Sequence, residues 1–398
     1  MIDVLQERLC DEFEDNTLTA CCFLTKALNQ KLGYYWFKRN GIVPHMNPNT
    51  LIPSLSIRGH KGYHALRLCR LFEGFRDLSL LTCTLSQVRN AAILELELLG
   101  SFFQSQPVHS LTIGLQCYCL PDVLSFLLQY PACREVSFFG DLSPFGEAPH
   151  LVEYPRHPRS HFDYNSWDHL TSFSAHSPLL LGYSGRSVAL AMAQGRFLRE
   201  LHLSDKSLPG KTWHTFLSKI SLPDLTVFEF EGQATLKTVC AFLDRHCKID
   251  DLTLGPSISS RVWRPKTFVL PQLTTLQAPA RLALPFIRVA PTLTHLTIKR
   301  DAWSTGEDVS DVLLSLVGTN VRVLSLDIDE DKMDAFNASY TPLCLRFLRH
   351  LSISSSAFTE GMFVSHSTAR FFIILTKFPG YLTQAINPSS LSSAHGPP

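Results

Sequence analysis

The chain has 398 residues, of which 45% are hydrophobic and 18% are charged. Its 36 basic and 35 acidic residues leave a formal net charge of +1. This balance gives no sign of a general affinity for nucleic acid or for an anionic membrane, so we expect neither as a partner.

The cysteines and the first residues indicate the compartment. The 11 cysteines are scattered without a CxxC pair, and the chain begins with an amphipathic, charged segment rather than a signal peptide. No apolar run approaches the roughly 18 residues of a membrane-spanning helix. We therefore expect reduced thiols in a cytoplasmic or nuclear protein.

Residues 1–43 form a separate segment with three short predicted helices. Apolar residues recur at helical spacing from Ile2 to Phe13, and Asp15-Asn16 is a suitable cap for a second helix. Asn29 is suited to cap a third helix, and Gly41 to end it. Because three helices in so few residues make a marginal domain, we expect this head to pack on the following segment or on a partner.

The head resembles an F-box. The resemblance lies in Asp3-Val-Leu5, in Asp15-Asn16-Thr-Leu-Thr-Ala-Cys-Cys22 and in Lys26-Ala-Leu-Asn29. The Leu-Pro pair that usually opens the motif is missing because the chain starts there, and a truncated sequence and a vestigial F-box are the two alternatives. The resemblance implies docking to the Skp-type adaptor of a cullin-RING (SCF-type) ubiquitin ligase. The residues that match adaptor-facing positions, or that alternatively only fill the helical core, are Ile2, Val4, Leu5, Leu9 and Leu18.

From Leu51 onward a six-residue pattern, apolar-x-x-apolar-x-apolar, keeps returning. Each copy predicts a short strand with its apolar residues on one face. From the centre of the first copy, Leu55, to the centre of the last, Leu351, the copies recur about every 27 residues, as in leucine-rich repeats. The copies are Ile52-Leu55-Ile57, Phe75-Leu78-Leu80, Val108-Leu111-Ile113, Cys133-Val136-Phe138, Leu170-Phe173-Ala175, Leu198-Leu201-Leu203, Leu225-Phe228-Phe230, Ile249-Leu252-Leu254, Leu273-Leu276-Ala278, Leu293-Leu296-Ile298, Val321-Leu324-Leu326 and Leu348-Leu351-Ile353.

Helical segments lie between several copies, and proline often follows them. The clearest are 121–130, 212–220, 236–246 and 308–317. Proline cannot continue a helix, so helix, break and short strand alternate as in a solenoid. The predicted fold class is α/β: an irregular leucine-rich-repeat solenoid with parallel β-strands on its concave face and helices on its convex face, behind a small all-α F-box-like head.

The boundaries of the predicted regions follow from these patterns. The solenoid covers residues 51–355 and contains a loop insertion at 140–168 that is rich in proline, histidine and aromatic residues. Residues 356–386 are expected to cap its open end, as solenoids require. Residues 387–398 are rich in serine and proline, and we expect a disordered tail.

The strand residues that point away from the apolar face are the candidate target site. Glu200, Glu229, Glu231 and Asp251 are expected to form an acidic stripe over neighbouring repeats, suited to a target of opposite charge. A solvated face without a ligand is the alternative. The complete set of candidate target-binding residues is Glu200, His202, Glu229, Glu231, Asp251, His295 and Lys299.

Catalytic patterns stay at background level. The segment from Gly182 to Arg186 approaches a nucleophile elbow around Ser184 but has Arg at the final Gly position. His150, His157, His161 and His169 do not have zinc-site spacing, and Cys117 and Cys119 are more typical of buried thiols beside a strand. We therefore expect no enzyme activity, no cofactor and no metal.

These patterns predict a non-enzymatic substrate-recognition subunit in the ubiquitin (Ubl) conjugation pathway. In this interpretation the head binds the Skp-type adaptor, and the solenoid binds an unknown protein target that other subunits modify. The alternative is a protein-interaction scaffold whose F-box is vestigial and which has no association with a ligase.

Overall fold

Both parts of the chain are α/β structures built on parallel strands. In the computed structural model the chain divides into two units, Met1–Asp205 and Lys206–Pro398. The structure describes the longer stretches 12–25, 80–104, 108–115, 132–140, 169–176, 195–206, 208–259, 269–327 and 348–354. It also describes residues 45–46, 53–58 and 382–385, and Leu28, Leu32, Tyr35, Trp36, Arg39, Val123 and Tyr130.

The first unit contains strands β1 to β7. Strand β1 (His45–Met46) pairs with β2 in the antiparallel direction, and β2 to β7 follow one another in parallel. The parallel strands are β2 (Pro53–Arg58), β3 (Leu80–Thr84), β4 (Ser110–Gly114), β5 (Glu135–Phe139), β6 (Ser172–His176) and β7 (Glu200–Asp205). The helices described here are α2 (Asp15–Leu24) and α5 (Arg89–Phe103).

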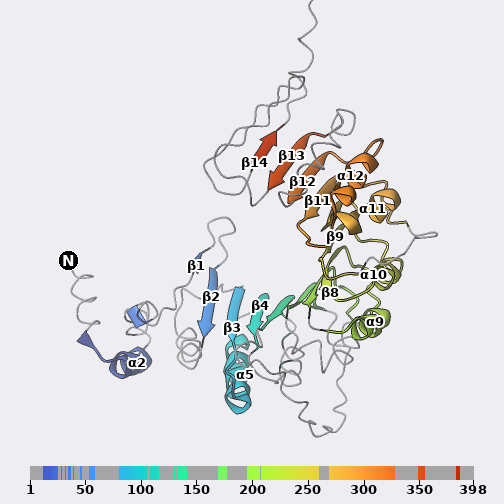
Figure 1. Ribbon diagram of the computed structural model, residues 1–398. Helices are drawn as coiled ribbons and strands as arrows, with labels where there is room; N and C mark the ends of the chain where they lie inside the picture. The colour runs from blue at the N-terminus through green and yellow to red at the C-terminus, as the bar shows by residue number, and fades with distance from the viewer. Residues whose placement is uncertain are drawn as a thin grey trace, which may run out of the picture. The chain divides into compact units, whose positions relative to one another are not determined.

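The second unit contains strands β8 to β14. Strands β8 to β13 are parallel and β14 (Leu382–Ala385) pairs antiparallel with β13. The parallel strands are β8 (Val227–Gly232), β9 (Asp251–Leu254), β10 (Thr275–Pro279), β11 (His295–Lys299), β12 (Val323–Asp327) and β13 (His350–Ser354). The helices α9 (Gly210–Lys219), α10 (Leu236–Leu243), α11 (Ala280–Val289) and α12 (Gly306–Ser315) lie on the same side of these strands (Figure 1).

The predicted central residues of the repeats are in register, with one exception. In the second unit Leu252 pairs with Phe228 on one side and with Leu276 on the other, and the same alignment continues to Leu351. In the first unit the aligned residues are Leu55, Leu81, Leu111, Val136, Phe173 and Leu201. The side chains of these centres from Leu81 to Leu324 are buried.

The exception corrects the second predicted repeat. We expected Leu78 at its centre, but Leu81 pairs with both Leu55 and Leu111. The sequence contains two overlapping copies of the pattern, three residues apart, and Leu78-Leu81-Cys83 is the copy in register. With this correction the centres lie 26 and 30 residues from their neighbours instead of 23 and 33, so the spacing is more even.

A tight turn leads into several strands. The N–H of the first buried residue of the pattern donates to the carbonyl three residues earlier, as in Leu225 to Leu222 (3.2 Å) and Leu293 to Ala290 (3.2 Å). Proline occupies the second turn position in three repeats, at Pro223, Pro271 and Pro291. Proline fixes the φ angle that the second turn position needs. The same proline therefore stops the preceding helix and favours the turn into the strand.

One carbonyl before each strand then joins consecutive repeats. The carbonyl of Thr226 accepts the N–H groups of Asp250 (2.9 Å) and Asp251 (3.2 Å). The equivalent carbonyls of Asp250, Thr274, Thr294 and Arg322 also each accept two N–H groups from the next repeat. The same arrangement occurs in the first unit at His109, Arg134 and Thr171. Backbone bonds, as well as side-chain packing, therefore fix the register between consecutive repeats.

Aromatic side chains fill the core of the second unit where its helices meet β8. Trp213 of α9 packs edge-on against Phe230 (centroids 4.8 Å apart), and Phe228 packs against Phe242 of α10 (4.5 Å). A Cβ atom at Gly232 would lie 2.4 Å from the indole nitrogen of Trp213. Glycine at this position therefore makes room for the buried tryptophan.

The helices lie close to their predicted ranges. Helix α10 falls within 236–246, where Thr235 caps it by accepting the N–H of Thr238 (3.2 Å). Helix α12 starts at Gly306 rather than 308, because Thr305 and Asp308 form a capping box there. Of the predicted helix 121–130, only Val123 and Tyr130 belong to the described part of the chain.

His246 is a buried polar link between two repeats. Its Nε2 accepts the backbone N–H of Leu222 (2.9 Å), its Nδ1 donates to the carbonyl of Phe242 (2.6 Å), and its ring stacks on Phe242. The bond from Leu222 requires the neutral ring, because a protonated Nε2 cannot accept, and burial lowers the pKa of His246 from 6.5 to about 4. The folded state therefore takes up this proton less readily than the unfolded chain.

The buried histidine predicts a specific pH dependence of stability. The depressed pKa favours the folded state above about pH 6.5, and this contribution of up to about 3 kcal/mol is lost as pH falls toward 4. Denaturant unfolding of the wild type and of His246→Leu should give free energies of unfolding that converge over this range. At pH 7 we expect the variant to be less stable by about 1–3 kcal/mol, because the N–H of Leu222 loses its acceptor.

The matched control is His214→Leu, which alters an exposed histidine on α9. It should leave both the stability at pH 7 and its pH dependence nearly unchanged. Parallel pH curves for His246→Leu and the wild type would contradict the assignment.

Candidate binding face of the second unit

The side chains of β8 to β12 alternate between the helix side and the opposite side. In β10, Leu276 and Ala278 are buried, whereas Thr275 and Gln277 are partly exposed. The same alternation holds in β8, β9, β11 and β12. We call the side chains that point away from the helices the open face.

Two rows of side chains run across the strands on the open face. The first row is Val227, Asp251, Thr275, His295, Val323 and His350. The second row is Glu229, Thr253, Gln277, Thr297, Ser325 and Ser352. Neighbouring strands in a sheet lie about 4.8 Å apart. The second row is therefore an unbroken line of polar side chains, whereas the first row contains two valines, Val227 and Val323.

The register gives the positions of the acidic residues that we expected to form one stripe. Glu229 pairs with Thr253, and Asp251 pairs with Val227, so the two carboxylates are diagonal neighbours. Glu231 forms an ion pair with Lys206 (2.9 Å). Glu200 and His202 belong to β7 of the first unit, where Glu200 is exposed and His202 partly exposed. A stripe shared by both units stays a prediction.

The remaining two candidate residues lie at opposite ends of one strand. His295 and Lys299 lie on β11, where the side chain of His295 is exposed. The Nδ1 of His295 is 2.9 Å from the hydroxyl of Thr294. Arg300 follows Lys299 and forms an ion pair with Asp327 of β12 (3.0 Å).

A buried arginine holds three consecutive repeats together beyond the ends of their strands. Arg281, at the start of α11, donates from Nε to the buried carboxylate of Asp301 (2.6 Å). Its remaining nitrogens donate to the carbonyls of Ile258 (2.7 Å) and Pro256. Arg281 therefore connects the loop after β9, its own helix after β10 and the loop after β11.

Asp301 organises the turn that follows β11. Its carboxylate also accepts the N–H of Trp303 (3.1 Å) and the hydroxyl of Ser304 (3.1 Å). The side chain of Trp303 itself is 76% exposed. The exposed indole of Trp303 therefore stands on a turn whose backbone is hydrogen-bonded to the ion-paired carboxylate of Asp301.

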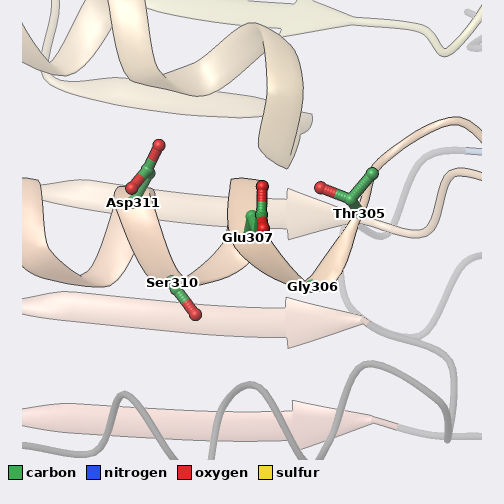
Figure 2. A pocket seen from close by; sticks show the side chains of 5 residues that line it. All are labelled: Thr305, Gly306, Glu307, Ser310 and Asp311. Carbon is green, nitrogen blue, oxygen red and sulfur yellow. The ribbon is translucent and has the colours of Figure 1, made fainter.

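An open depression lies at the start of α12 and has polar walls. It is lined by Thr305, Gly306, Glu307, Ser310 and Asp311. Figure 2 shows Glu307 and Asp311 pointing to one side of α12 and Ser310 to the other. Because these groups do not converge on one point, we assign no substrate to the depression.

The predicted adaptor-binding residues are only partly described. Ile2, Val4, Leu5 and Leu9 lie outside the described residues. Leu18 is fully buried, which matches the core-filling role that remained open for it. In the same helix, the side chain of Leu24 is 70% exposed.

Several sequence candidates fall outside the described residues. They are the insertion after residue 140, the elbow-like segment around Ser184, the thiols of Cys117 and Cys119, and His150, His157 and His161. In the described part of the chain, no group of three or more His, Cys, Asp or Glu side chains is placed to hold a metal ion. No helix there has the length and apolar character needed to cross a membrane.

Sequence reasoning missed Arg281 and His246, but it indicated Asp301 as a residue able to form local hydrogen bonds. Asp301 stands where leucine-rich repeats favour an Asn or Cys after the strand, and this position is a signal for loop hydrogen bonds. Gln233 occupies the same position and donates to the carbonyl of Lys206 (2.6 Å) in the preceding repeat. No pattern in the sequence marks Arg281, whose partners lie 20 or more residues away.

Comparison with known proteins finds no family model and no curated protein that matches the chain.

The arginine link predicts unequal effects of two arginine substitutions. Arg281→Met leaves Asp301 as a buried charge without its cation, so the free energy of unfolding should fall by about 3–5 kcal/mol. Arg300→Met removes an ion pair whose side chains are 38% and 45% exposed, and should cost at most about 1 kcal/mol. Urea unfolding of both variants tests this difference, and equal losses would contradict it.

Proposed function

We propose that this protein is a non-enzymatic substrate-recognition subunit of an SCF-type ubiquitin ligase. Its F-box-like head binds a Skp-type adaptor, and its leucine-rich-repeat solenoid binds a target protein across the open face. The subunit supplies proximity and orientation, while other subunits carry out the transfer chemistry.

The open face is the observation that carries the target-binding part of the proposal. Its strands are locked in register by backbone bonds at one end, and by Arg281 at the other end of three repeats. Polar side chains on such a rigid scaffold lose little conformational freedom when a partner binds. The rows cross six parallel strands, which suits an extended protein surface rather than a small molecule.

The head carries the ligase part. The supporting residues are the F-box-like segments between Asp3 and Asn29. The exposed Leu24, at the end of α2, adds an apolar side chain in this segment that is available to a partner.

An interaction scaffold with a vestigial F-box is the second candidate. The two candidates share the open face and differ only in adaptor binding.

Adaptor binding can be tested by co-expression with a Skp-type adaptor and affinity purification. We expect the wild type to retain the adaptor, and Leu5→Asp and Leu24→Asp to reduce the retained amount by about tenfold, because a charge is placed in an apolar contact. Leu94→Asp is the matched control, since Leu94 is 60% exposed on α5. If the wild type retains no adaptor, the ligase function is wrong and the scaffold remains.

A further inference from the structure

The helix side of the second unit carries an exposed basic surface on α9 and α10, which lie next to each other (Figure 1). Its basic residues are Lys211 and Lys219 of α9, Lys237 of α10, and Arg245, which closely follows α10. All four side chains are exposed, and we call them the basic platform. Within the two helices and the two residues that follow α10, Asp244 is the one acidic residue.

Contacts at both ends hold the two helices of the basic platform together. A Cβ atom at Gly210 would lie 2.6 Å from the carbonyl oxygen of Gln233, so the start of α9 touches the segment that leads into α10. At the other end, Nη2 of Arg245 donates to the carbonyl of Leu217 in α9 (2.7 Å). The backbone positions of the four basic residues are therefore fixed relative to one another.

Lys211 and Lys237 occupy the same position in consecutive repeats, since each is the second residue of its helix. A cation in the first turn is unfavourable, because the helix dipole places partial positive charge there. Neither lysine forms an ion pair or a side-chain hydrogen bond with a described residue. The fold therefore gains nothing from these two charges, whose mutual repulsion is a further cost.

The other end of the basic platform has a structural role and an uncompensated charge. Lys219 lies in the last turn of α9, where the helix dipole favours a cation. Arg245 donates from Nη1 to the carbonyl of Ala241 (2.9 Å), in addition to its bond to α9. Neither side chain forms an ion pair with a described residue. The eight residues from Lys211 to Lys219 cover about 12 Å along the helix axis.

The charges of α12 distinguish between classes of anionic partner. This helix lies on the same side of the strands and carries Glu307 and Asp308 in its first turn, Asp311 in the next, and no basic residue. A nucleic-acid duplex or a flat anionic membrane would bring phosphate groups against these carboxylates as well. A short acidic segment of a protein can contact α9 and α10 alone.

We infer that the basic platform binds an acidic segment of a partner protein. Carboxylates of the segment pair with Lys211 and Lys237 at one end, and with Lys219 and Arg245 about 12 Å farther along the helices. An extended segment spans that distance in about four residues. The platform lies on the side of the sheet opposite to the open face, so it is a second protein interface and does not depend on the proposed ligase role.

Differential selection of a random peptide library tests the inference. The full-length wild type and Lys211→Glu/Lys237→Glu are immobilised separately, and peptides enriched only on the wild type should be rich in Asp and Glu. In fluorescence anisotropy at low salt, a selected peptide should bind the variant about tenfold more weakly. Replacing the acidic residues of the peptide with Gln should weaken its binding to the wild type to a similar extent.

Thermal unfolding separates loss of binding from loss of folding. The variant places carboxylates in the first turns of α9 and α10, where the helix dipole favours them, so its unfolding temperature should not fall. The matched control is Arg196→Glu/Arg349→Glu, which makes the same change of charge at exposed residues outside the two helices. The control should leave peptide binding unchanged.

Three results would overturn the inference. They are the absence of acidic peptides among those specific to the wild type, an equal loss of binding in the control, and tighter binding of duplex DNA or phosphatidylserine vesicles than of the peptide through Lys211 and Lys237. The proposed function fails differently, because adaptor retention tests the head. Loss of adaptor retention with intact peptide selection would remove the ligase role and keep the basic platform.

Discussion

The short strand that cannot bury its own apolar face is the constraint on which both units depend. Strand β9 has four residues and β10 has five, and each is stable only between neighbours. The carbonyl of Thr226, which accepts two N–H groups from the next repeat, shows how a neighbour is placed. Once that junction forms, Phe228 and Leu252 must meet, and the hydrophobic core follows from the register.

This constraint explains why the strands could be predicted from the sequence. A fixed junction forces apolar residues to recur at the same three positions, so the pattern around Leu225, Phe228 and Phe230 returns along the chain. The error at Leu78 has a physical reason. Two overlapping copies of the pattern fit the same stretch, and only pairing with Leu55 and Leu111 distinguishes them.

The polar links between repeats could not be predicted in the same way. His246 occupies the position that Leu222 and Leu270 have in the neighbouring repeats. It stabilises the fold by accepting the backbone N–H of Leu222, 24 residues away in the sequence. Arg281 likewise satisfies groups in two other repeats. Each link joins residues that are close together only in the folded stack of repeats. No spacing within one repeat therefore predicts it. The candidate site was predictable as a face, but the partners of its charges were not.

The two faces of the sheet therefore differ in how strongly the fold constrains their residues. On the helix side, a change at Leu252 or Leu276 alters a packed core and the register with it. On the open face, Asp251 and Thr275 take no part in that packing, and their side chains are partly exposed. The fold sets where these side chains stand and at what spacing, but it does not require their charge. The polar side chains of the open face thus have no structural task in the core, which is the physical reason to look for their purpose in binding.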